Sequence, residues 1–115
     1  MKVAIIMGSM SDFDKVEPMI NLLKSYEVNV VARCLSAHRA HNSLVEFINE
    51  CNNNETEVII SAAGMAAALP GVVASMTTLP VIGVPLTSKN LEGMDALLSI
   101  VQMPSGVPVA CVAID

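Results

Sequence analysis

Two short polar segments of this sequence hold the side chains best suited to chemistry on an anionic ligand. In Ser36-Ala37-His38-Arg39, the arginine offers a planar fork of donors that fits a phosphate. His38 is one of two histidines, a residue type that exchanges protons near neutral pH. The same pair is also ordinary loop surface. The residue types alone leave a catalytic pair and a solvated pair evenly balanced.

The second polar segment is Gly8-Ser9-Met10-Ser11-Asp12. A glycine allows a tight turn, and two hydroxyls beside a helix amino end suit a phosphate. Asp12 is able to accept hydrogen bonds from ribose hydroxyls. Serine and aspartate are equally typical of helix caps. On composition alone we favour the interpretation that Ser11 or Asp12 only caps the following helix.

The remaining candidates carry weaker signals. Residues 62–71 are mostly alanine and glycine, which let a backbone approach a flat ligand but serve close helix–sheet packing equally well. His41 is predicted to be solvated at the start of a helix, and no partner at ligand spacing indicates zinc. The three cysteines stand in apolar segments and are interpreted as buried, reduced thiols: Cys34, Cys51 and Cys111.

The elements that position these segments alternate between strand and helix. Continuous apolar runs without polar alternation are typical of a parallel sheet covered on both faces, where ligands bind beyond the carboxyl ends of the strands. The order of elements predicts an α/β fold with right-handed crossovers. Strands are predicted at 3–7, 28–35, 58–62, 81–84 and 107–114, and helices at 13–23, 43–51, 70–76 and 94–101.

Two local features bear on the helix boundaries. Pro18 inside the first helix costs about 3 kcal/mol in a helix interior, so we expect a kink or a late start there. Ser43 followed by Glu46 has the form of a capping box and predicts that the second helix starts at that point.

Length and composition limit the class of protein. A chain of 115 residues is one domain, residues 1–115, and its 53% hydrophobic and 15% charged residues exclude a disordered chain. No apolar run reaches membrane-spanning length and no signal peptide is recognisable, so we expect a cytoplasmic protein without membrane contact. The net charge of −5 argues against nucleic acid as a partner.

Taken in order, four motifs resemble one family. The sequence resembles the N5-carboxyaminoimidazole ribonucleotide mutases, also called the catalytic subunit of phosphoribosylaminoimidazole carboxylase, over essentially its whole length. The stretch from Ile100 to Val109 is the most specific. The motifs are Gly8-Ser9-x-Ser11-Asp12, Ser36-Ala37-His38-Arg39, Ala63-Gly64-x-Ala66-Ala67-x-Leu69-Pro70-Gly71 and Asp95-Ala96-Leu97-x-Ser99-Ile100-Val101-Gln102-Met103-Pro104-x-Gly106-Val107-Pro108-Val109.

The resemblance implies a flavodoxin-like three-layer α/β/α sandwich with strand order 2-1-3-4-5, assembled as a homo-octamer with sites at subunit contacts. It implies an isomerase of purine biosynthesis that needs no cofactor: no metal, nucleotide triphosphate or biotin. The carboxyl group leaves the exocyclic nitrogen as carbon dioxide, stays trapped, and is reattached at ring carbon four. A functional pairing with the ATP-dependent carboxyaminoimidazole ribonucleotide synthetase is a further implication.

The resemblance also assigns roles to residues of this chain. It makes His38 the catalytic proton-transfer residue. It implies that phosphate is bound by Ser9, Ser11 and Arg39, ribose by Asp12, and the base by Ser36 and the loop residues Gly64, Met65, Ala68 and Leu69. Arg39 favours the mutase class, because the class that carboxylates with free carbon dioxide usually has lysine there.

The sequence departs from the family pattern at three places. Ala40-His41 replaces the usual Thr-Pro, so the cap of the second helix is expected at Asn42 or Ser43. Ala68 stands where the family usually has histidine. The sequence ends at Asp115, after the fifth strand, where relatives continue into at least one more long helix, and we interpret the domain as truncated.

Other functions remain open from the sequence. Ala68 and the missing last helix favour a catalytically impaired or truncated homologue that binds the ribonucleotide. A carboxylase of aminoimidazole ribonucleotide using free carbon dioxide is a second alternative. A flavodoxin-like architecture would also permit a non-catalytic nucleotide- or flavin-binding module. His38 beside Arg39 argues against a flavin module. A phospho-receiver domain is disfavoured because clustered acidic residues are missing after the first strand.

Overall fold

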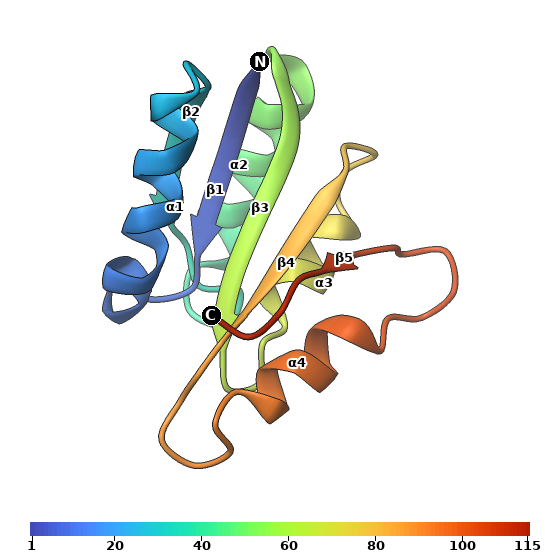
Figure 1. The fold of residues 1–115 in the computed structure, drawn as a ribbon. Helices are drawn as coiled ribbons and strands as arrows, with labels where there is room; N and C mark the ends of the chain where they lie inside the picture. The colour runs from blue at the N-terminus through green and yellow to red at the C-terminus, as the bar shows by residue number, and fades with distance from the viewer.

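Five parallel strands form one sheet in the order β2-β1-β3-β4-β5 in the computed structural model, which describes residues 1–115 (Figure 1). Strand β1 pairs with β2 on one side and with β3 on the other along its whole length. This confirms the predicted flavodoxin-like sheet. The strands are β1 (Lys2–Met7), β2 (Asn29–Cys34), β3 (Thr56–Gly64), β4 (Val81–Leu86) and β5 (Ala110–Cys111).

Helices cover both faces of the sheet, as the continuous apolar strands require. On one face α1 buries Val16 and Ile20 against β1 and β3. On the other face α2, α3 and α4 share a larger core with the same strands. The helices are the 3₁₀ helix η1 (Met10–Asp12), α1 (Phe13–Ser25), α2 (His41–Asn53), α3 (Leu69–Ala74) and α4 (Met94–Val101). None of them combines the length and the apolar character that a membrane crossing needs.

The last strand differs most from the sequence prediction. Of the apolar run Val107–Ile114, only Ala110 and Cys111 pair with β4 as a strand. Beyond them, single backbone bonds run from Val112 N–H to Gly83 O (3.2 Å) and from Asp115 N–H to Pro85 O (2.8 Å). An edge strand has a partner on one side only, so apolar composition did not guarantee a regular ladder. By contrast, β3 and β4 extend beyond the predicted runs towards their carboxyl ends.

Three further expectations are corrected. The first helix begins at Phe13 and contains Pro18, so a late start is wrong; the buried stripe of Val16 and Ile20 outweighs the lost hydrogen bond. The second helix begins at His41, with no side-chain cap, so the capping box and the caps at Asn42 or Ser43 are wrong. Its first turn is already held by Leu44 N–H to Ala40 O (3.0 Å).

The cysteines match the prediction of buried thiols only in part. Cys51 is buried in the α2 core, but Cys34 at the end of β2 is exposed and Cys111 is half-buried.

On the side of the sheet that α2 covers, α4 lies very close to β4. A Cβ on Gly83 would stand 2.4 Å from Cγ2 of Ile100, so only glycine permits this approach.

Candidate active site

The carboxyl ends of β1, β2 and β3 bring the three sequence-predicted turns together. Gly8 N–H donates to Ala62 O (3.2 Å), which ties the turn after β1 to the end of β3. Leu35 N–H donates to Met7 O (2.9 Å), which ties the turn after β2 to the end of β1. These two bonds follow from parallel pairing. Side chains far apart in the sequence therefore share one edge of the sheet, where α/β folds bind their ligands.

In the first turn, Ser9 is the capping residue. Its Oγ accepts from Ser11 N–H (3.3 Å) and lies 2.9 Å from Ser11 Oγ, while its backbone carbonyl accepts from Asp12 N–H (3.1 Å). Asp12 stands at the N-cap of α1 but makes no side-chain cap bond. The interpretation that Ser11 or Asp12 only caps the helix is therefore wrong, and the Asp12 carboxylate remains available to a ligand.

The second turn is held by Ser36. Its Oγ accepts from Arg39 N–H (3.2 Å), and its carbonyl accepts from Ala40 N–H (2.9 Å). His38 and Arg39 are both exposed, and their side chains make no hydrogen bond or ion pair within the chain. The guanidinium is thus an unpaired cation beside a free imidazole. His41 lies at the surface at the first position of α2, as predicted.

The third segment leaves β3 in an irregular loop. Met65 has a left-handed backbone (φ 56°), and the residue is 62% exposed. Two tight turns follow, with Ala67 N–H donating to Met65 O (2.9 Å) and Ala68 N–H to Ala66 O (2.7 Å). Such backbone geometry in a non-glycine residue is costly and is typical of functional loops.

Within this loop the side chains divide between core and surface. Ala67 and Leu69 are buried in the α2 core, so Leu69 is able to offer a ligand little besides its backbone. Gly64 lies against the end of β4, where a Cβ would stand 3.3 Å from Leu86 O. Ala68, at the N-cap of α3, is only half-buried. Met65, Ala66 and Ala68 are therefore the loop side chains that are not buried.

Charge couples the first two turns. Burial raises the pKa of Asp12, against the opposing effects of the Ser9 backbone and the Lys15 ammonium. Burial also raises the pKa of the Cys34 thiol; the charge of Asp12 adds to that rise and the charge of Arg39 opposes it. Cys34 thus lies within the electrostatic reach of both turns, and its thiol stays protonated at neutral pH. No three acidic, histidine or cysteine side chains gather in a way that suits a metal ion.

Sequence reasoning missed a polar cluster next to the first turn, formed by Lys15, Thr87 and Asp115. No local signal could have found it, because Lys15 and Thr87 are 72 residues apart. A surface hollow of about 350 Å³ between Asn52 and the loop 75–79 lies at the amino ends of the strands and is remote from the three turns.

A parallel sheet of order 2-1-3-4-5 with polar turns at its carboxyl edge defines a flavodoxin-like protein with a candidate ligand site at that edge. The sequence matches the family described as AIR carboxylase over residues 2–115. The chain belongs to this family.

Named relatives support the same assignment. The N5-carboxyaminoimidazole ribonucleotide mutase of Saccharolobus solfataricus is 54% identical over 113 residues, which are 98% of this chain and 72% of that protein. The enzyme of the same name from Aquifex aeolicus is 50% identical over 97% of this chain and 67% of its own length. The crystal structure of Treponema denticola PurE superposes with a TM-score of 0.89 at 31% identity, covering 96% of this chain and 70% of that one.

Proposed function

We propose that this protein is an isomerase of purine biosynthesis that converts N5-carboxyaminoimidazole ribonucleotide into 4-carboxyaminoimidazole ribonucleotide. The observation that carries the proposal is the meeting of the Ser9–Asp12 turn with His38 and Arg39 at one edge of the sheet. Around 50% identity to mutases over nearly the whole chain supports this reaction over others compatible with the fold.

In this proposal each turn binds one part of the ribonucleotide. Arg39 forms charge-assisted hydrogen bonds with the phosphate, joined by the hydroxyls of Ser9 and Ser11. The Asp12 carboxylate, free of any capping bond, accepts from the ribose hydroxyls. Ser36 and the loop residues Gly64, Met65, Ala68 and Leu69 line the base.

The reaction requires one proton to be donated to the exocyclic nitrogen and one to be removed from ring carbon four. The bond between the exocyclic nitrogen and the carboxyl group breaks, carbon dioxide leaves, and the nitrogen takes a proton from the His38 imidazolium. Ring carbon four then attacks the trapped carbon dioxide and forms the new carbon–carbon bond. The neutral His38 finally removes the proton from ring carbon four, which restores the aromatic ring. No cofactor enters this balance.

The trapped carbon dioxide needs a site closed to water. His38 is exposed in the single chain, so closure has to come from the bound ribonucleotide or from another subunit. Arg39 supports the mutase over a carboxylase that uses free carbon dioxide, because the latter class usually has lysine there. The assay that decides is loss of N5-carboxyaminoimidazole ribonucleotide without ATP or added bicarbonate. Turnover only of aminoimidazole ribonucleotide with carbon dioxide would favour the carboxylase, and binding without turnover the impaired homologue.

Arg39→Ala is expected to weaken ribonucleotide binding by about 2 kcal/mol, about thirtyfold, because the phosphate loses its unpaired cationic partner. Titration calorimetry measures the change. The matched control is Arg33→Ala, since Arg33 lies over the Phe47 ring (5.3 Å) and donates to Ala32 O (3.0 Å), away from the turns. Unchanged binding in Arg39→Ala would place the phosphate elsewhere.

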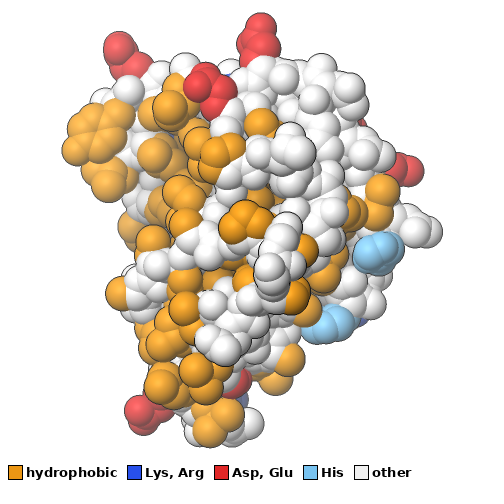
Figure 2. All heavy atoms as spheres, turned by 90° about the vertical axis from the view of Figure 1, so that its right-hand side faces the viewer, with side chains coloured by type: hydrophobic (Ala, Val, Ile, Leu, Met, Phe, Trp, Pro, Cys, Tyr) orange, Lys and Arg blue, Asp and Glu red, His pale blue; other side chains and the backbone are white.

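We also propose that the protein is a homo-oligomer, an octamer by resemblance, with sites at subunit contacts. Apolar side chains are exposed over α4 and the C-terminal segment, the side that Figure 2 presents: Leu91, Met94, Leu98, Val101 and Val112. On the α1 face, a hollow of about 280 Å³ lies between α1, the end of β4 and the C-terminal segment, and most of the residues that line it are apolar. Apolar surface of this extent is typical of protein interfaces.

Sedimentation velocity is accordingly expected to show a species larger than one 12.1 kDa chain. The physical reason is that α4 and the C-terminal segment expose large apolar side chains, and burying that area stabilises an assembly. Leu98→Glu, on the exposed side of α4, is expected to shift the distribution towards smaller species. A monodisperse monomer of the native chain would contradict the proposal.

The remaining parts of the proposal concern the location of the protein and its partners. A cytoplasmic location and a functional pairing with the ATP-dependent carboxyaminoimidazole ribonucleotide synthetase follow from the proposed reaction. The net charge of −5 disfavours nucleic acid as a partner.

A further inference from the structure

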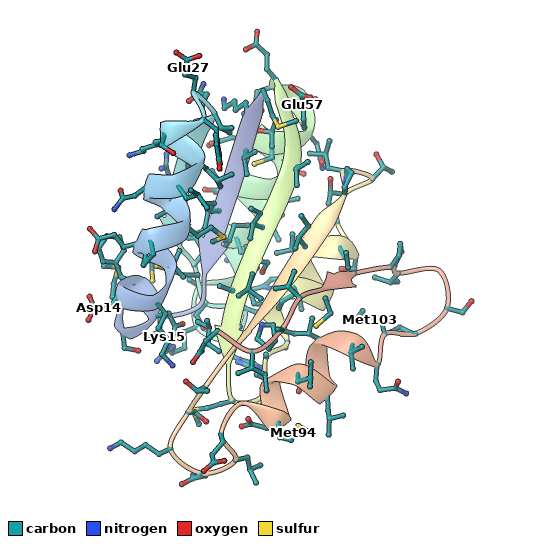
Figure 3. The ribbon with its side chains drawn as sticks, viewed as in Figure 1. Asp14, Lys15, Glu27, Glu57, Met94 and Met103 are labelled. Carbon is teal, nitrogen blue, oxygen red and sulfur yellow. The ribbon has the colours of Figure 1, made fainter.

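Three polar side chains from distant parts of the chain meet beside the first turn. Lys15 Nζ, in the first turn of α1, donates to the carbonyl of Thr87 (2.9 Å) and contacts its hydroxyl. Asp115 accepts from Thr87 N–H (2.8 Å) and Thr87 Oγ1 (2.7 Å), and lies 3.4 Å from Lys15 Nζ. We call Lys15, Thr87 and Asp115 the α1 clamp. It joins α1, the end of β4 and the segment after β5 (Figures 1 and 3).

The clamp lies directly behind the turn proposed to bind phosphate and ribose. α1 begins at Phe13, immediately after Asp12, and Lys15 is in its first turn. Asp12 makes no side-chain cap bond to α1, so its carboxylate, which meets the Ser9 backbone within the turn, does not anchor the helix start. The hydrogen bonds of Lys15 instead attach the start of the helix to the carboxyl edge of β4. The side chain of Lys15, labelled in Figure 3, points from α1 towards this edge.

The α1 clamp contributes little to the stability of the fold. The side chains of Lys15 and Asp115 are 38% and 40% exposed, and ion pairs this exposed contribute little to folding. Nor is Lys15 a free cation for a phosphate, because its ammonium already has two oxygen partners on Thr87 and a carboxylate partner. What the clamp does fix is the position of the helix start, and with it the turn before it.

We propose that Lys15 is a positioning residue, which through Thr87 and Asp115 holds the 8–12 turn in the place where it binds the ribonucleotide. This inference rests on the proposed function for its ligand. The Lys15 charge has a second effect on the same turn, since it opposes the rise that burial causes in the pKa of Asp12. An ionised Asp12 is the form that accepts hydrogen bonds from two hydroxyls.

The test compares Lys15→Met with Lys24→Met, the same substitution in the last turn of the same helix, where the side chain of Lys24 makes no hydrogen bond or ion pair. In Lys15→Met the KM for N5-carboxyaminoimidazole ribonucleotide is expected to rise by about three- to tenfold while kcat stays within about twofold. Lys15→Arg restores a donor and is expected to recover most of the native KM. Lys24→Met is expected to match the native enzyme.

A second variant guards against misfolding and tests the link through the clamp. Asp115→Asn keeps the shape but removes the charge, and it is expected to raise KM in the same direction. In the Lys15→Met/Asp115→Asn double variant the two effects are expected to be less than additive, because both break one cluster. Additive effects, or a native KM in Lys15→Met, would overturn the proposal. So would equal losses of kcat and thermal stability in Lys15→Met and Lys24→Met.

Hydrogen exchange separates failure of the clamp from failure of the proposed reaction. Amides of residues 8–13 are expected to exchange faster in Lys15→Met than in Lys24→Met, with the β1 and β3 amides unchanged. If the native protein shows no turnover, the proposed reaction is wrong and this comparison alone decides the clamp. Equal exchange of the turn in both variants overturns it.

Discussion

Replacing His38 by asparagine is expected to abolish turnover, with a loss of about 10²- to 10⁴-fold, the usual contribution of a positioned general acid–base group. Asparagine keeps a polar side chain of similar reach but takes no part in proton transfer. Ribonucleotide affinity is expected to change little, because phosphate and ribose are assigned to Arg39 and the first turn. Single-turnover kinetics and calorimetry on the same preparation measure the two quantities separately.

The chain offers a matched control for this experiment. His41→Asn replaces the other histidine, which is exposed at the first position of α2, and it is expected to keep native turnover. The comparison matters because His38 is itself exposed and makes no bond that would mark it as structural. Parallel loss of turnover and affinity in His38→Asn would make His38 a binding residue instead.

The sheet was predictable because its order follows from few constraints. Short apolar runs alternating with helical stripes leave a parallel sheet with right-handed crossovers, and the family resemblance fixed the order that the structure confirms. The exact ends were not predictable. The apolar run Val107–Ile114 predicts a strand, but pairing at the edge of the sheet depends on one partner only, and only Ala110 and Cys111 pair with β4.

The candidate site was predictable for a related reason. Once the strands are parallel, residues following β1, β2 and β3 must share one edge, so the three turns were placed from the sequence. Their internal bonding was not. Whether Ser9 or Asp12 caps a helix depends on backbone angles that composition does not encode. The α1 clamp depends on side chains 72 and 28 residues apart, a contact that only the folded chain creates.

Ala68→His is expected to raise the turnover rate of this protein by about ten- to a hundredfold. The N5-carboxyaminoimidazole ribonucleotide mutases usually have histidine at this position, in the loop proposed to lie over the base. A histidine there would donate a hydrogen bond to the migrating carboxylate or to trapped carbon dioxide, whereas a methyl group has no donor. A hydrogen bond to a charged group contributes about 1.5–3 kcal/mol, which gives this range if it acts only in the transition state.

The side chain of Ala68 is partly open to solvent. Ala68 is half-buried, unlike its core neighbours Ala67 and Leu69, and it makes no side-chain cap bond. Its backbone stays held by Ala68 N–H to Ala66 O (2.7 Å) and Val72 N–H to Ala68 O (3.0 Å). A water bound in the space beside alanine would replace part of the missing bond and reduce the gain.

Turnover of the native chain, Ala68→His and Ala66→His under identical conditions tests this expectation. Ala66 belongs to the same loop and is exposed, so its histidine variant adds the same group at a neighbouring place. We expect a gain at position 68 and none at position 66, with KM nearly unchanged in both. Equal gains would indicate a nonspecific effect of an added imidazole. An equal or lower rate in Ala68→His would mean that the site is organised around alanine, and that the loop does not act on the carboxyl group as proposed.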